Sequence, residues 1–188
     1  MNCGSGRVCR NRWTGFLTAP RKSGALTMGC VCRSVFCSIT CGACITSALF
    51  FRTADGAGIE RLLLSGITAR PPKSAISKTA LGAEERVPWD SVADLSSGLR
   101  ELREHGYEIA AIETSNRAVD LFDWRPHFPV CVLFGHEVEG ISADILAACD
   151  THVRIPMLGL KHSLNVASAG SIVMYELLRK YRQLRGLT

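Results

Sequence analysis

The chain lacks acidic residues over its first fifty positions, although the whole sequence of 188 residues contains 17. The same stretch holds six of the 22 basic residues. The formal net charge of +5 therefore arises there, because residues 51–188 carry the other 16 basic residues against 17 acidic ones. Long apolar runs are also lacking: none reaches the roughly 18 residues that a membrane-spanning helix needs. We therefore expect no membrane segment.

Cysteine is scarce after residue 50 and abundant before it, where seven of the nine cysteines lie. Five of the seven follow a spacing that resembles zinc ligation, namely Cys30-x-Cys32 and Cys37-x3-Cys41-x2-Cys44. A zinc module usually has paired CxxC turns, however, and only one such pair is present, so we expect no metal. A disulfide framework would need an oxidising compartment, and residues 1–28 lack the apolar stretch of a secretory leader. A transit peptide stays open, since the segment contains arginine and serine but no acid.

Residues 51–188 alternate between apolar runs and helical patterns. Short apolar runs predict strands over residues 59–65, 107–113, 130–134 and 153–155. Helical spacing or composition predicts helices over residues 77–85, 92–104, 142–149 and 163–184. Strands that alternate with helices indicate an α/β fold, a parallel sheet flanked by helices. Ligands of such sheets bind beyond the carboxyl ends of the strands, here at Gly66, Gly135 and the loop 156–161.

Three clusters contain residues suited to chemistry, and they cover Phe51–Gly58, Leu133–Ser142 and Ile155–Gly170. Each cluster has a purely structural explanation when it is taken alone. Arg52 can be a surface charge, Glu137 can belong to a solvated turn, and Asn165 early in a helix can bond the local backbone. A lone glycine-rich loop is weak evidence for a ligand.

Taken together and in this order, the clusters resemble the motifs of the SpoU (TrmH) family of RNA ribose methyltransferases, within the SPOUT class. The last motif of that family is matched by Ile155-Pro156-Met157 and by Ser163-Leu164-Asn165-Val166. Gly135, Glu137 and Gly140 match its Gly-x-Glu-x-x-Gly motif, and Arg52-Thr53-Ala54-Asp55 matches the second half of its first motif. The resemblance covers about residues 51–188, which would form the methyltransferase domain.

The resemblance implies a C-terminal trefoil knot and a cofactor, S-adenosylmethionine. By position in the motifs, the cofactor-binding residues would be Gly135, Ile155 and Leu164, together with Leu133, Met157 and Gly159. Members of the family are homodimers in which each site is completed across the interface, and the helix 163–184 is a candidate for that interface. The implied partners are tRNA or rRNA, with neither metal nor membrane, and the two cysteines after residue 50 suit a reduced cytoplasm.

The resemblance also implies 2′-O-methylation of ribose and gives four residues catalytic roles. Arg52 stands where the family arginine removes the proton of the 2′-hydroxyl with the help of a phosphate. Because a guanidinium has a pKa above about 12, we expect Arg52 to hold the substrate phosphate and to orient the ribose. Glu137 would orient Arg52 or its own loop. Ser163 and Asn165 would donate or accept hydrogen bonds near the reacting ribose.

The first half of the first motif is missing. The family pattern runs approximately His-Asn-x-Arg-Ser-x-x-Asn-Val-Gly-Ala-x-Phe, and here Thr46 and Ala48 stand at the second asparagine and the glycine. A shifted reading frame can be tried, in which each codon takes the last base of one residue's codon and the first two bases of the next. Starting at the last base of the Ser38 codon, a suitable choice among synonymous codons gives His-Asn-Met-Arg-Ser-Met-His-Asn-Val-Gly-Ala-Leu-Phe. Our hypothesis is that residues 1–50 are an aberrant, frame-shifted segment with little ordered structure. It requires ATA codons at Ile39 and Ile45, which the nucleotide sequence can test.

Two other functions stay open. A non-catalytic RNA-binding SPOUT protein, inactive because its first motif is incomplete, would keep the fold without turnover. A knotted methyltransferase acting on a base nitrogen is less consistent with Arg52 and Ser163-Leu164-Asn165. Residues 51–188 are slightly acidic, whereas RNA binders normally present a basic surface, so that surface would have to be assembled by folding.

Overall fold

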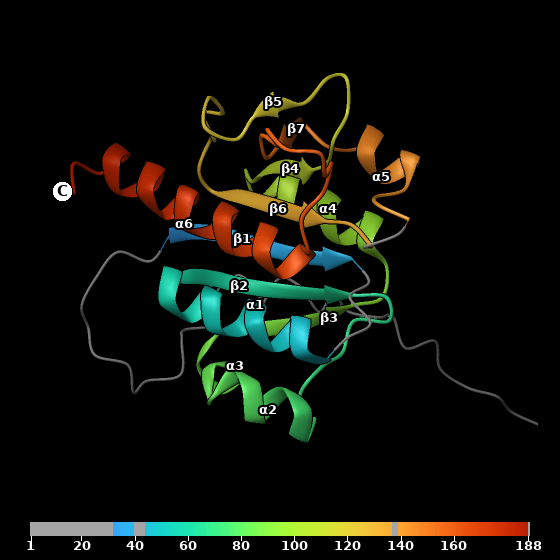
Figure 1. Cartoon of the computed structure of the whole chain (residues 1–188), viewed down its shortest axis with the longest axis vertical. Coiled ribbons are helices and arrows are strands. Elements are labelled where there is room, and N and C mark those ends of the chain that lie inside the picture. Colours follow the sequence, from blue (N-terminus) through green and yellow to red (C-terminus); the bar gives the residue numbers. More distant parts are fainter. Residues whose placement is uncertain (1–31, 40–43, 137–138, 188) are drawn as a thin grey trace, which may run out of the picture.

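The computed structural model describes residues 32–39, 44–136 and 139–187. Over these residues, seven strands form one sheet in the order β3-β2-β1-β6-β4-β7-β5, and every pair of neighbours is parallel (Figure 1). The strands are β1 (Cys32–Ile39), β2 (Ile59–Ser65), β3 (Trp89–Val92), β4 (Glu108–Ile112), β5 (Val119–Asp120), β6 (Val130–Phe134) and β7 (Thr151–Arg154). The predicted α/β class with a parallel sheet is confirmed.

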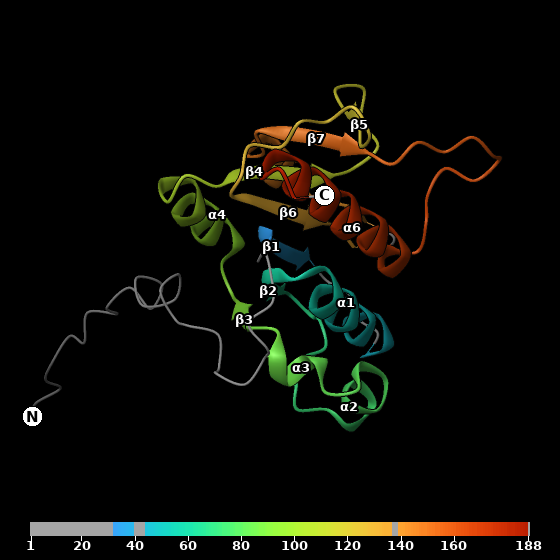
Figure 2. The same cartoon turned by 90° about the vertical axis from the view of Figure 1, so that its left-hand side faces the viewer.

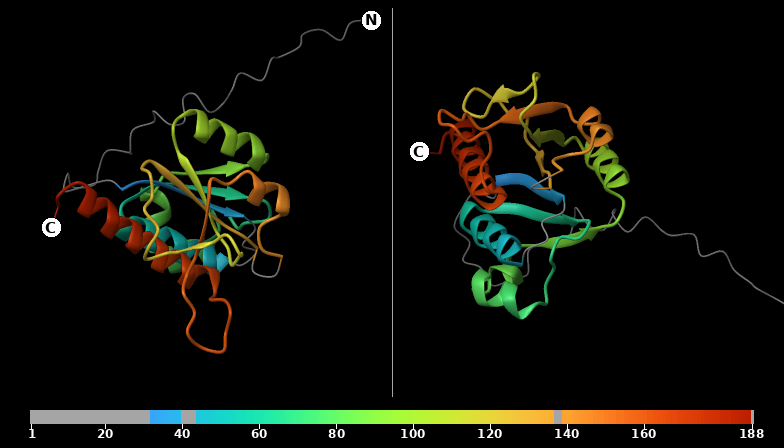
Figure 3. Two further views of the ribbon diagram at one scale, coloured as in Figure 1. Left: turned by 90° about the horizontal axis from the view of Figure 1, so that it is seen from above. Right: turned by 45° about the vertical axis from the view of Figure 1, so that its right-hand side comes forward.

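Helices cover both faces of this sheet, as Figures 2 and 3 show. One face carries α1 (Cys44–Ala57), α2 (Ser74–Ala80), α3 (Ala83–Arg86) and α6 (Val166–Leu184), and the other carries α4 (Leu95–Glu104) and α5 (Ala143–Ala147). Successive side chains of a strand point to opposite faces. Leu62 and Leu64 accordingly join the core under α1 and α6, while Leu63 joins the core under α4 and α5. Burial on both faces explains why β2 and β6 are continuous apolar runs.

The segment before Phe51 differs from what we expected. β1 lies between β2 and β6 in the interior of the sheet, and α1 crosses the boundary that we predicted at residues 50 and 51. Val35, Phe36 and Ile39 belong to residue types that favour strands, and Ala48 and Phe50 are buried. Our expectation of little packed structure was therefore wrong for residues 32–39 and 44–50. Residues 1–31 and 40–43 lie outside the described residues, and the frame hypothesis, which concerns codons, stays a prediction.

Other elements show where local patterns fall short. The strands predicted over 59–65 and 130–134 have the bounds observed for β2 and β6. The helix predicted over 77–85 is interrupted, because Leu81 and Gly82 adopt left-handed backbone angles, with φ of 55° and 85°. β3 and β5 were not predicted, since β3 contains Asp90 and Ser91 and β5 has only two residues. None of the described helices is long and apolar enough to cross a membrane.

Candidate functional site

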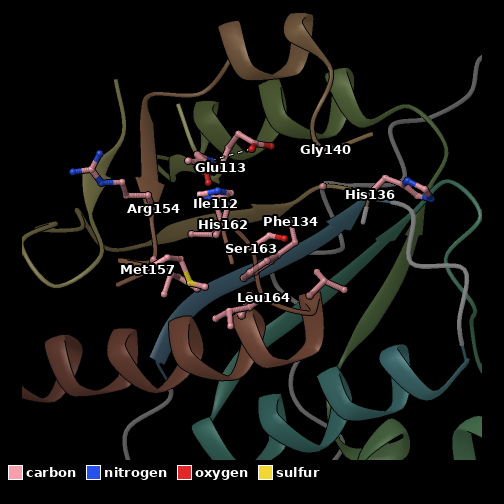
Figure 4. Close-up of a pocket in the computed structure, with 15 residues that line it drawn as sticks. Ile112, Glu113, Phe134, His136, Gly140, Arg154, Met157, His162, Ser163 and Leu164 are labelled. Atoms are coloured by element: carbon pink, nitrogen blue, oxygen red, sulfur yellow. Dashed lines mark hydrogen bonds between the residues drawn. The ribbon is translucent and has the colours of Figure 1, made fainter. Parts of the chain in front are cut away.

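A cavity of about 260 Å³ opens at the carboxyl ends of β4, β6 and β7 (Figure 4). Its walls are the last residues of these strands, the segments that follow them, and the first turn of α6. They comprise Ile112, Glu113, Thr114, Phe134, Gly135, His136, Gly140, Arg154, Ile155, Met157, His162, Ser163, Leu164, Val166 and Ala169. The sequence predicted ligand binding at three strand ends, and two of them meet at this cavity. These are Gly135 and part of the loop 156–161.

Four of the six residues predicted to contact the cofactor line this cavity: Gly135, Ile155, Met157 and Leu164. Leu133 does not, because it precedes Phe134 on β6 and so points to the opposite face of the sheet, where it is fully buried under α4 and α5. Gly159 also lies outside the cavity lining, in the loop between β7 and α6 that projects from the body in Figure 2.

The rim of the cavity is set by a tight turn after β6. His136 and Gly140 form an antiparallel bridge, in which each backbone N–H donates to the other's carbonyl over 2.9 Å. A Cβ atom on Gly135 would lie 2.4 Å from the carbonyl carbon of Gly140 and 2.7 Å from the nitrogen of Ile141. Real Cβ atoms do not approach backbone so closely, so only glycine fits at Gly135. Glu137, the predicted orienting carboxylate, lies outside the described residues.

A carboxylate that sequence reasoning missed stands at the same rim. Glu113 follows β4 directly, and its Oε1 accepts a hydrogen bond from the N–H of Thr114 over 2.9 Å. Its other oxygen, Oε2, would lie 3.0 Å from a Cβ placed on Gly140. Figure 4 shows this side chain reaching toward Gly140. The signal was present, because Glu113 ends a predicted strand of an α/β sheet, where ligands bind.

The two predicted polar residues before α6 have different surroundings. Ser163 lines the cavity and is exposed. Asn165 is the N-cap of α6: its Oδ1 accepts a hydrogen bond from the N–H of Ala167 over 2.9 Å, and it does not line the cavity. The local structural role that an asparagine early in a helix can play is thus the one it has here. α6 begins at Val166 and not at Ser163, because this cap fixes its start.

Arg52 is not among the residues that line the cavity. Arg52 lies between the two ends of α1, and its side chain is exposed. Within the described residues its guanidinium has no hydrogen-bond or ion-pair partner. α1 itself is fixed against α6, since Thr53 Oγ1 lies 3.1 Å from Ser171 Oγ and a Cβ on Gly170 would lie 2.7 Å from the Phe50 ring. Within one chain Arg52 is therefore no part of the cavity wall, and this cation is accessible to another molecule.

The described residues contain no group of three or more side chains that could hold a metal ion. Cys131 and Cys149 are buried, and burial raises the pKa of the Cys149 thiol to about 11. That thiol is protonated near neutral pH and is a poor ligand or nucleophile. Of the cysteines in the spacing noted before residue 45, Cys30 and Cys41 lie outside the described residues.

Comparisons with known proteins show the family to which the chain is similar. Residues 48–175 match the model of the SpoU rRNA Methylase family. A Staphylococcus haemolyticus protein assigned to the TrmH family of tRNA/rRNA methyltransferases is 35% identical over 132 residues, which cover 70% of this chain and 53% of that protein. The chain spans about half the length of the curated relatives that it matches.

Solved structures share the fold. The AdoMet-bound rRNA methyltransferase from Sinorhizobium meliloti is 25% identical with a TM-score of 0.73, over 78% of this chain and 56% of that one. An RNA 2′-O ribose methyltransferase is 26% identical with a TM-score of 0.70, over 86% of this chain and 61% of that one.

Proposed function

The chain belongs to the SpoU rRNA methylase family, and from this we propose that it transfers a methyl group to a ribose 2′-hydroxyl of tRNA or rRNA. The observation that supports this most strongly is the cavity at the strand ends. Gly135, Ile155, Ser163 and Leu164, which come from two separate motifs, meet there. The similarity to a solved RNA 2′-O ribose methyltransferase favours the ribose over a base nitrogen as the acceptor.

S-adenosylmethionine is the cofactor, and the residues of the cavity suit it. A relative with this fold has been solved with AdoMet bound. Phe134, Ile155, Met157 and Leu164 offer apolar surface to an adenine ring and to the carbon chain of the methionine part, and the Glu113 carboxylate can accept hydrogen bonds from hydroxyl or amino groups. When bound, the cofactor supplies a methyl group on a positively charged sulfur, which a correctly aligned hydroxyl can attack.

The chain's own contribution is to position the RNA and to handle one proton. Ser163 is exposed at the cavity and can hydrogen-bond the ribose. Arg52 can hold the phosphate next to that ribose, since its guanidinium is exposed and unpaired within the described residues. As the 2′-oxygen takes up the methyl group, its proton would pass to an oxygen of the phosphate that Arg52 holds and from there to water. Asn165 caps α6 and would act by fixing the helix start beside Ser163. Glu137 is proposed to orient Arg52 or its own loop, on the family pattern alone.

We propose a homodimer because Arg52 does not line the cavity of its own chain. α1 and α6 lie side by side and expose large apolar side chains: Ile45 (61% exposed), Leu49 (38%), Ile172 (37%) and Tyr175 (53%). Tyr175 also lies over α1, since a Cβ on Gly56 would lie 2.9 Å from its hydroxyl oxygen. If two copies pair through this surface, Arg52 of each copy can reach the cavity of the other.

The trefoil knot and a cytoplasmic location complete the proposal. The knot is proposed on the family pattern alone, and the cytoplasm is proposed because RNA substrates occur there.

A second candidate is an RNA-binding protein without turnover. It is favoured by Thr46 and Ala48, which stand at the asparagine and glycine of the first motif and are both buried. Incubation with radiolabelled S-adenosylmethionine and total tRNA or rRNA distinguishes the two candidates. Methyl incorporation supports the enzyme, whereas RNA binding without incorporation supports the second candidate.

A further inference from the structure

A second cavity, of about 500 Å³, lies at the opposite end of α6 from the first. It is an open cavity between the segment 122–128, which follows β5, and the last turns of α6, and its lining residues include Phe122, Arg125, Phe128, Arg179 and Lys180. Val166 lines the first cavity and Arg179 the second. At 1.5 Å of rise per residue, the thirteen positions between them place the two cavities about 20 Å apart along the helix.

Lys180 builds one wall of this cavity. Its ammonium group donates to the carbonyls of Leu121 over 2.7 Å and Phe122 over 3.2 Å, and also to that of Trp124. It also lies 3.4 Å from a carboxylate oxygen of Glu176. These contacts fasten the turn after β5 to α6. Phe122 is thereby held on a fixed backbone, where its N–H donates to Asp120, while 59% of the residue remains exposed.

Arg179 and Arg125 give the cavity its positive charge. The Arg179 guanidinium donates twice to the Glu176 carboxylate, over 2.8 and 2.7 Å, and once to Gln183 over 3.1 Å. Its plane is thus fixed, although 56% of the side chain stays exposed. Arg125 is exposed and has no hydrogen-bond or ion-pair partner within the described residues. Among the lining residues, Asp123 is the one carboxylate.

We propose that this second cavity binds an unpaired nucleotide of the RNA substrate, about 20 Å from the ribose that is methylated. The base would stack on the exposed Phe122 ring beside the fixed Arg179 plane, and Arg125 would contact a phosphate. Aromatic rings and guanidinium planes are the surfaces on which single-stranded bases stack. A separation of about 20 Å corresponds to roughly six stacked nucleotides at 3.4 Å each. The inference rests on the proposed function, because it assumes that the substrate is RNA.

The test compares binding of fluorescently labelled total tRNA and of a single-stranded RNA oligonucleotide by the full chain and by its variants. Phe122→Ala should raise Kd about tenfold or more, and Phe122→Trp should keep Kd near that of the unaltered chain, because stacking contributes on the order of 1–3 kcal/mol per base. Arg125→Ala should weaken binding and reduce the slope of log Kd against log salt by about one. Arg100→Ala, on an exposed position of α4 on the other face of the sheet, is the matched control and should change neither.

The outcomes separate this inference from the function on which it rests. S-adenosylmethionine affinity, measured by calorimetry, should be the same in all four variants, which shows that the first cavity is intact. The inference is overturned if the unaltered chain binds RNA and the Kd values of Phe122→Ala and Arg125→Ala lie within twofold of its own. That result would be expected if the second cavity were instead a surface for a protein partner. If the unaltered chain neither binds nor methylates RNA, the proposed function fails and the inference fails with it.

Discussion

Gly135 and Gly140 approach each other so closely that a side-chain carbon on Gly135 would lie 2.4 Å from the carbonyl carbon of Gly140. This contact defines the rim of the cavity at the carboxyl end of β6, where the cofactor is proposed to bind.

Gly135→Ala should therefore weaken S-adenosylmethionine binding at least tenfold, because the backbone of Gly140 and Ile141 has to move to admit the methyl group. An overpacked site of this kind also costs about 1–3 kcal/mol of stability. Calorimetric titration measures the first effect and urea unfolding the second. Gly159→Ala is the matched control, since a Cβ there meets nothing within 4 Å and the residue lies outside the cavity lining. An equal loss of S-adenosylmethionine affinity in Gly135→Ala and Gly159→Ala would contradict the proposal that the cofactor binds in this cavity.

Gly170→Ala should destabilise the fold by about 1–3 kcal/mol, because the added carbon would lie 2.7 Å from the ring of the buried Phe50 where α6 packs on α1. Phe50→Leu removes that ring and should offset part of the loss in the double variant. Urea unfolding of both single variants and the double variant gives the coupling energy. Strictly additive losses would show that the two residues do not clash.

Glu176 should stabilise the protein in a pH-dependent way. Hydrogen bonds from Arg179 hold the pKa of this carboxyl below its ordinary value of 4.5. A carboxyl whose pKa is lower in the folded state contributes stability above its unfolded pKa, and this contribution is lost as the pH falls through the folded pKa. The stability difference between the unaltered chain and Glu176→Gln should thus be full at pH 6–7 and shrink as the pH falls below about 4.5. A difference that grows on acidification would reverse the sign and contradict the ion pair.

Arg52→Ala should lower methyl transfer by about a hundredfold or more, the order expected when a group that aligns or stabilises the reacting centre is lost. Because Arg52 is exposed and unpaired within the described residues, unfolding and S-adenosylmethionine binding should stay unchanged. Loss of cofactor binding together with transfer would assign Arg52 a different role.

Mixing Arg52→Ala chains with Gly135→Ala chains tests whether the site is shared between copies. Each variant alone should be nearly inactive. If the partner's Arg52 serves each cavity, half of the dimers in an equal mixture contain one intact site, and about a quarter of the activity should return. No recovery after confirmed subunit exchange would place Arg52 and the cavity in the same chain.

Some elements could be predicted from local sequence and others could not. β2 and β6 are buried on both faces, so each is an uninterrupted apolar run with clear ends. β1 was not predicted, because the composition of residues 1–50 indicated an aberrant segment. Its position in the sheet comes from pairing with β2 and β6, which lie later in the chain and which a local pattern does not show. Gly135, Ile155, Ser163 and Leu164 could be named from local motifs, and they line the cavity, while their roles stay predictions. Glu113 belongs to no motif, and its place beside Gly140 arises only when β4 pairs with β6.

The most direct measurement is nucleoside analysis of tRNA and rRNA after incubation with radiolabelled S-adenosylmethionine, for the unaltered chain and for a chain carrying the restored first motif. The account predicts that the restored chain yields a nucleoside labelled at the ribose 2′-oxygen. A restored chain that folds and binds S-adenosylmethionine but labels no RNA, or that labels a base instead of a ribose, would contradict it.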